Sequence, residues 1–140
     1  MKAISSAKQV FVMQKRLIRT ITKCRRNVSC RTKFRKSKIL TLCCLYIFEI
    51  SVLIFKNQNY FSRQSENHLY DTRIKNTFNL PKYRLTLSQK GPNYIGLKIF
   101  NHLPINIKNA ANLNAFKKAL KIFLINNEFY FIQDFFNVKF

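Results

Sequence analysis

The side chains that could act as nucleophiles, acids or metal ligands are few and scattered in this sequence. Its 140 residues include four cysteines, two histidines and five acidic residues. Cys24 and Cys30 lack the two-to-four-residue spacing of cysteines in zinc sites. Cys43 and Cys44 are adjacent within an apolar run, where they are expected to behave as small buried hydrophobic residues. Neither histidine has a cysteine or histidine at ligand spacing. We therefore expect no metal ion and no cofactor.

The motifs of common enzyme classes are not found either. There is no Gly-rich phosphate loop, no nucleophile elbow and no His-Glu-x-x-His pattern. Asp71 and Asp134 are isolated in sequence, whereas two-metal phosphoryl transfer needs several carboxylates at one site. The sequence predicts that this chain is not an enzyme by itself and has no small-molecule substrate.

Basic residues dominate the charge of the chain and point to a polyanionic partner. There are 26 Lys and Arg against 5 Asp and Glu, a formal net charge of +21. No acid precedes Glu49, and 13 of the 26 basic residues lie within the first 38. Guanidinium groups suit phosphate because each can donate two parallel hydrogen bonds. We predict sequence-independent binding of nucleic acid, RNA or DNA, through Arg16, Arg19, Lys23, Arg25, Arg26, Arg31, Lys33, Arg35, Lys36 and Lys38. A solvated basic arm or a targeting segment would have the same composition.

An apolar segment from Ile39 to Phe55 offers an alternative of a different class, a small basic membrane-anchored protein. The segment has a single charge, Glu49, and lysines on both flanks. At ~1.5 Å per residue it spans about 25 Å, less than the ~30 Å hydrocarbon core, and the carboxylate would lie near the bilayer centre. A core helix with Glu49 at its polar edge is the favoured reading, and the corresponding localisation is nuclear or cytoplasmic.

Four regions are expected along the chain. Residues 1–38 form a basic arm with a first helix, 39–57 an apolar helix, 58–69 a polar linker and 70–140 a C-terminal helical segment. In the last region Phe116, Ala119, Leu120, Phe123 and Leu124 follow helical spacing, and Asn112 or Asn114 can cap that helix. Tyr83, Leu85 and Leu87 alternate with polar residues. The predicted fold is mainly α, with three to five helices and one short extended or β segment near residues 82–88.

Several segments together resemble the C-terminal region of jockey-like non-LTR retrotransposon reverse transcriptases. MQKRLIRTIT at 13–22 is similar to a Q-K-R-x-I-R-x-I-T run, and SCRTKFRKSKILTL at 29–42 to an S-C-R-P-L-F…I-L-T-L segment. Tyr70, Thr72 and Arg73 match a Y-x-T-R element. RLTLSQKGPNYIGLKIFNHLP at 84–104 continues through Ile107 and Lys108 into AFKKALKIFL at 115–124, like R-L-T-x-S-Q…G-x-K-x-F-N-x-L-P-x-x-I-K-N…F-K-K-x-L. The order of these motifs, over about residues 11 to 136, makes the resemblance specific.

The resemblance implies the tail of an RNA-directed DNA polymerase of a mobile element. The family's Tyr-x-Asp-Asp turn, whose carboxylates hold two Mg²⁺ ions, is not in this sequence, so no polymerisation is expected of it. Thr32 and Lys33 stand where Pro and Leu are usual, and Cys43-Cys44 replaces Pro-Ser. The resemblance thus predicts a truncated remnant that at most binds nucleic acid. A further alternative is that its apolar faces require a missing polymerase domain and that it does not fold alone.

Overall fold

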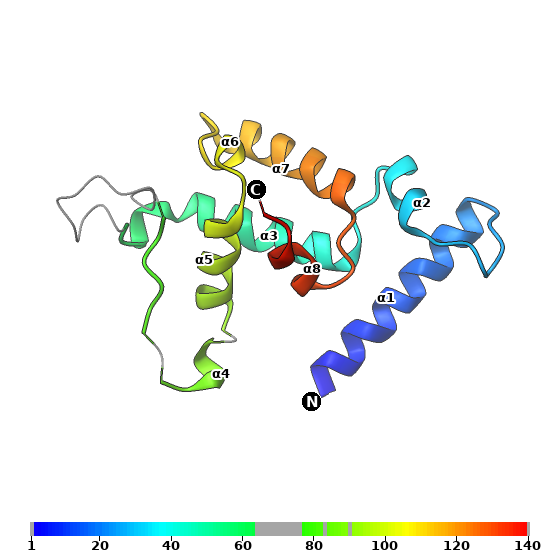
Figure 1. Ribbon diagram of the computed structural model, residues 1–140, viewed down its shortest axis with the longest axis horizontal. Coiled ribbons are helices and arrows are strands. Elements are labelled where there is room, and N and C mark those ends of the chain that lie inside the picture. The colour runs from blue at the N-terminus through cyan, green and yellow to red at the C-terminus, as the bar shows by residue number, and fades with distance from the viewer. Residues whose placement is uncertain (1, 64–76, 83, 90, 140) are drawn as a thin grey trace. The chain divides into compact units, whose positions relative to one another are not determined.

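The computed structural model describes residues 2–63, 77–82, 84–89 and 91–139 and is mainly α-helical, as predicted (Figure 1). No strand occurs in these residues; one isolated antiparallel bridge joins Arg63 and Phe78. The longer helices are α1 (Lys2–Ile21), α3 (Leu42–Lys56), α5 (Pro92–His102) and α7 (Leu113–Asn127). The shorter helical elements are α2 (Arg31–Lys36), the 3₁₀ turn η1 (Gln58–Tyr60), α4 (Thr86–Gln89), α6 (Ile105–Lys108) and α8 (Ile132–Asn137).

The chain divides into two compact units. Unit 1 comprises Met1–Phe48 and Ala119–Val138, and unit 2 comprises Glu49–Lys118 and Lys139–Phe140. The divisions fall inside α3 and α7, so each of these helices contributes residues to both units. All ten predicted nucleic-acid contacts belong to unit 1.

The core of unit 1 is built where α1, α2 and the chain after α7 meet. Ile18, Cys30 and Phe34 are buried, and Phe11 and Tyr130 pack against them. The Tyr130 ring meets Phe11 edge-on at a centroid distance of 5.0 Å and Phe34 at 6.3 Å. This is the perpendicular arrangement that aromatic quadrupoles favour. The Tyr130 ring, about a hundred residues later in the sequence, therefore joins α1 to α2.

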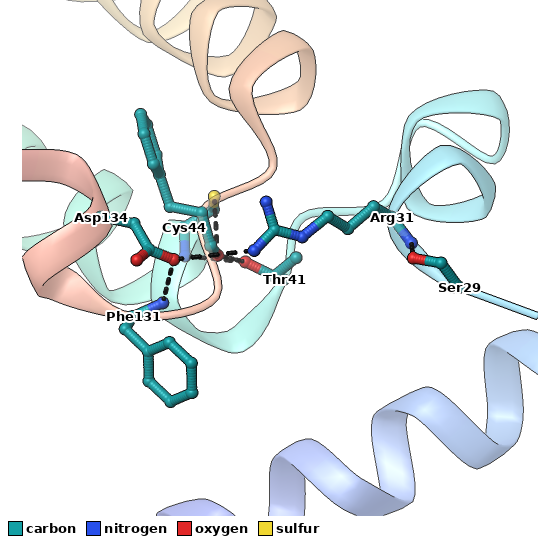
Figure 2. A network of polar contacts seen from close by, with 7 residues as sticks. Ser29, Arg31, Thr41, Cys44, Phe131 and Asp134 are labelled. Carbon is teal, nitrogen blue, oxygen red and sulfur yellow. Dashed lines mark hydrogen bonds and ion pairs between the residues drawn. The ribbon is translucent and has the colours of Figure 1, made fainter. Parts of the chain in front are cut away.

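Polar side chains fix the start of α3 in unit 1. Gln14 Nε2 donates to the Leu40 carbonyl at 2.8 Å, and its Oε1 accepts from the Leu42 amide at 3.0 Å. Thr41 is the N-cap residue: its hydroxyl accepts from the Cys44 amide and donates to the Phe129 carbonyl (Figure 2). Because Thr41 is almost fully buried, its hydroxyl would be costly to leave unpaired.

Aromatic rings fill the core of unit 2. Phe116 stacks on Phe55 at 4.2 Å and on Phe100 at 5.8 Å between centroids, and Phe78 lies 5.3 Å from Phe100. Gly96 brings α5 close to α3, since a Cβ there would lie 3.0 Å from Ile50 Cγ1. The core of this unit is therefore apolar and close-packed.

One side-chain amide holds an irregular segment of unit 2 against α5. Asn101 Oδ1 accepts from the Phe78 amide at 2.8 Å, and its Nδ2 donates to the Phe78 carbonyl at 2.9 Å. The same residue's carbonyl accepts from Lys108 Nζ at 3.0 Å, and burial lowers the pKa of that lysine. The Asn101 side chain thus satisfies both backbone groups of Phe78, as the backbone of a neighbouring strand would.

The extended segment predicted near residues 82–88 is wrong, because Thr86–Gln89 forms helix α4. An alternating pattern becomes a strand only where a neighbouring strand completes its hydrogen bonds, and the described residues provide none. A local bond forms instead, from the Gln89 amide to the Leu85 carbonyl at 3.3 Å. Residues 1–38, expected to form a basic arm with one helix, also contain the second helix α2, which buries Phe34.

Helices α7 and α3 lie where the sequence predicted them. α7 has Phe116, Leu120 and Leu124 fully buried, and the Ala115 amide donates to Asn112 Oδ1 at 2.8 Å, so Asn112 is the cap. α3 lies within the predicted 39–57, with Cys44 buried and Glu49 exposed.

Two predictions concern residues outside the described ranges. They are the part of the predicted linker that follows Arg63 and the motif of Tyr70, Thr72 and Arg73.

In the part that the structure describes, none of the helices has both the length and the apolarity needed to cross a membrane.

Candidate nucleic-acid interface

A basic cleft forms at the end of α1 in unit 1. It has a volume of about 810 Å³ and is lined by Arg16, Arg19, Thr20, Lys23, Cys24 and Arg26. We call it the α1 cleft. Four of its six residues are cationic: helical spacing brings Arg16 and Arg19 near one another, and Lys23 lies in the turn that follows the helix. Its positive charge suits a phosphate-bearing ligand.

The backbone at the end of α1 creates this cleft. Lys23 has a φ of 48°, and a pair of hydrogen bonds joins the Lys23 amide to the Thr20 carbonyl and the Cys24 amide to the Arg19 carbonyl. This is the Schellman pattern that ends helices. The Thr22 hydroxyl also donates to the Ile18 carbonyl at 2.7 Å. The reversal turns the chain so that Arg26 faces the same cleft as Arg16.

The positive charge of unit 1 is almost uncompensated. Its residues include fourteen Lys and Arg but only two acids, Glu128 and Asp134. Glu128 accepts from Arg35 Nε at 2.8 Å, and Asp134 lies 3.8 Å from Arg31 (Figure 2). Both acids are therefore occupied by α2 arginines, and neither lines the α1 cleft.

The cations of the α1 cleft have no carboxylate partner among the described residues. Arg19 Nε is buried and has no hydrogen-bond partner. A buried donor without an acceptor costs free energy. The Arg19 Nε–H therefore needs an acceptor, and a phosphate oxygen is one.

The pKa of the Cys24 thiol is lowered by its surroundings at the end of α1. Hydrogen bonds from Thr22 and Lys33 lower the pKa of its thiol, and the positive charges of Lys33 and Arg19 act in the same direction. The pKa of Cys43 is instead raised to about 12, chiefly by burial. The thiolate of Cys24 is thus stabilised mainly by its hydrogen-bond neighbours, with a smaller contribution from the cleft residue Arg19.

The ten predicted contact residues separate into groups. Arg16, Arg19, Lys23 and Arg26 come together in the cleft, and Lys33 acts on its cysteine. Arg31 and Arg35 instead bind the acids of unit 1. Arg35 also donates to the Asn126 carbonyl at 2.8 Å, and Arg31 lies over the Tyr130 ring at 4.6 Å. The remaining three residues are exposed at the surface: Arg25, Lys36 and Lys38.

Two residues of the cleft, Thr20 and Cys24, were not among the predicted contacts. Their signal is positional: Thr20 lies one helical turn after Arg16 in α1, and Cys24 follows directly after the turn that ends this helix. Among the described residues, no group of three or more His, Cys, Asp or Glu side chains could hold a metal ion.

Comparison with known proteins identifies no relative. No family model matches the chain, and no curated protein and no solved structure is similar to it at a significant level.

Proposed function

We propose that this chain is a helical nucleic-acid-binding segment derived from the C-terminal region of a non-LTR retrotransposon reverse transcriptase. It has no catalytic activity of its own and binds RNA or DNA without sequence preference. The observation that carries the proposal is the α1 cleft, in which four cations converge with no acid among them. Phosphate contacts of this kind fix nucleic acid in place but read no sequence.

The contacts of the resemblance motifs support the proposed origin. Gln14 lies in the 13–22 segment, Thr41 in the 29–42 segment and Asn101 in the 84–108 segment. Gln14 and Asn101 each make two hydrogen bonds to backbone groups more than twenty residues away, and Thr41 makes one such bond, to Phe129, beside its local bond to Cys44. The motifs therefore include residues on which the packing of this chain depends, as expected if the motifs mark a common fold.

The salt dependence of nucleic-acid binding tests the proposed function. We expect the affinity for a single-stranded oligonucleotide to fall steeply with salt, because binding releases counterions from phosphates. The variant R16Q/R19Q/K23Q/R26Q removes the four cleft cations. It should reduce the slope of log K against log salt by about 3, at ~0.7 for each lost phosphate contact.

A charge-matched variant provides the control. Lys8, Lys98, Lys118 and Lys121 are exposed and lie outside the cleft, so their replacement by Gln removes the same charge. This control should keep most of the slope, and both variants should keep the helical circular dichroism signal. An equal slope in the cleft variant and the wild-type chain would overturn the assignment. Arg31 and Arg35 are unsuitable for this test, because their loss would also leave Asp134 and Glu128 unpaired.

A further inference from the structure

Helix α1 has an apolar stripe on its surface that no part of unit 1 covers. Val10, Met13, Leu17 and Ile21 are 51%, 61%, 62% and 66% exposed. Their spacing places them along one side of the helix. At ~1.5 Å per residue the stripe is about 16 Å long.

The stripe is separate from the face by which α1 packs. Phe11, Gln14 and Ile18 point to the core of unit 1 and to the start of α3. Arg16 and Arg19 line the cleft on another side. Helix α1 therefore has a packed face, a cationic face and a second apolar face that is left in water.

A second copy of the chain does not suit this stripe. Two copies that paired through it would bring together two units with fourteen basic residues and two acids each. The four side chains also make a patch of only a few hundred Å², whereas a stable protein interface buries about 800 Å² on each partner. A narrow aliphatic stripe beside cations fits a lipid surface better, because each apolar side chain can insert singly and no complementary shape is needed.

We propose that α1 binds in the plane of an anionic lipid bilayer. Met13 and Leu17 enter the boundary between headgroups and acyl chains, and the long side chain of Arg16 beside them reaches lipid phosphates. The partner is chosen on charge complementarity: α1 contains no acid, and a bilayer with anionic lipids attracts each basic residue near its surface. This binding shares Arg16 with the proposed nucleic-acid site, but it differs in that it also needs the apolar stripe.

Vesicle flotation of the full chain tests this proposal. We expect binding to vesicles of phosphatidylcholine mixed with phosphatidylglycerol, and little binding to phosphatidylcholine alone. The variant M13Q/L17Q should lower partitioning to the anionic vesicles by at least about tenfold, given ~0.8 kcal/mol for each buried CH₂. I122Q makes the same kind of change at a residue of α7 that is 53% exposed in unit 1, and it should leave partitioning unchanged.

Three results would overturn the proposal. These are no binding of the wild-type chain to anionic vesicles, equal binding of M13Q/L17Q and wild type, or a lipid-free dimer that M13Q/L17Q dissociates. The last would assign the stripe to a second copy. Oligonucleotide binding should be unchanged in M13Q/L17Q, so the lipid proposal and the proposed nucleic-acid function can fail separately.

Discussion

The two units of this chain are held together in different ways. In unit 1, polar side chains make several long-range connections beside the Tyr130 ring, as Thr41 does to the Phe129 carbonyl and Arg35 to Glu128. In unit 2 the stacked rings of Phe55, Phe100 and Phe116 fill the core. Hydrogen bonds depend on direction, whereas ring burial depends mainly on area. The directional bonds of unit 1 therefore fix where its basic side chains lie. Unit 2 is stabilised mainly by apolar packing.

Backbone conformation shows the same contrast. The described residues other than glycine that have positive φ are Lys23, Lys38 and Glu128, and all three belong to unit 1. Both glycines of the chain, Gly91 and Gly96, belong to unit 2. Unit 1 thus ends its helices with side chains in a conformation that glycine adopts at lower cost. In exchange, it keeps a charged side chain at each of these turns.

Thiol reactivity gives the largest expected effect and concerns unit 1 alone, since all four cysteines lie there. The thiolate is the reactive form. The pKa of Cys24 is lowered and that of Cys43 is raised to about 12, so at neutral pH a larger fraction of Cys24 is thiolate. We expect iodoacetamide to label Cys24 at least about tenfold faster than Cys43, because the larger thiolate fraction outweighs the lower nucleophilicity of a less basic thiolate, as measured by mass spectrometry of digests. Bound oligonucleotide should slow the labelling of Cys24 only; faster labelling of Cys43 would contradict the prediction.

Removal of the central ring of unit 2 should cause the largest loss of stability. Phe116→Ala leaves a cavity between Phe55 and Phe100 and should lower the free energy of unfolding by about 3–5 kcal/mol. Urea unfolding followed by circular dichroism measures this. Phe131→Ala is the matched control, because that ring is 61% exposed in unit 1. Equal losses in the two variants would refute the role given to the rings of unit 2.

Removal of one hydroxyl tests the polar connections of unit 1. Thr41→Val keeps the shape of the side chain but leaves the Phe129 carbonyl and the Cys44 amide without this partner. The expected loss is about 1–3 kcal/mol, from the same urea measurement. Thr20→Val serves as control, since that hydroxyl is exposed and bonds only to the Arg16 carbonyl of its own helix. A loss below that of the control would mean that these polar contacts do not stabilise unit 1.

The smallest effect should be a gain in stability. Lys38 has a φ of 53° at the end of α2, a conformation that costs an L-residue roughly 1–2 kcal/mol. Lys38→Gly removes this strain but increases the freedom of the unfolded chain. We expect a net gain of up to about 1 kcal/mol in the free energy of unfolding. Lys36→Gly, inside the helix, should instead be destabilising by about 0.5–1 kcal/mol, and a gain there would contradict the explanation.

Periodicity predicted the parts of the fold that depend on local pattern. The stripe through Phe116, Leu120 and Leu124 gave α7, and Asn112 is its cap. Helix α2 could not be predicted in this way, because its one buried residue, Phe34, packs against Tyr130 far along the chain. The strand expected near residues 82–88 failed for a related reason, since a strand depends on a neighbour that sequence pattern does not supply.

The same difference between local pattern and contacts of distant residues decides which parts of the candidate site the sequence could predict. The sequence already named Arg16, Arg19, Lys23 and Arg26 among ten contacts, and the structure brings these four together through the turn at Lys23. The ion pairs of Arg31 and Arg35 could not be foreseen, because their partners, Asp134 and Glu128, lie about a hundred residues later. Charge density along a sequence therefore identified the region but not which cations remain available.

The paired contacts of Asn101 and Asn79 have a practical consequence for engineering. Asn101 holds Phe78, and the Asn79 amide donates to the Ser62 carbonyl at 2.9 Å, so the positions on either side of residues 64–76 are fixed together. These bonds use backbone groups of Ser62, Phe78 and Asn79, so a neighbouring side chain can be changed without removing them. Leu80 is 39% exposed, and a fluorescent label on a cysteine placed there would report on whether this part of unit 2 stays closed in binding assays.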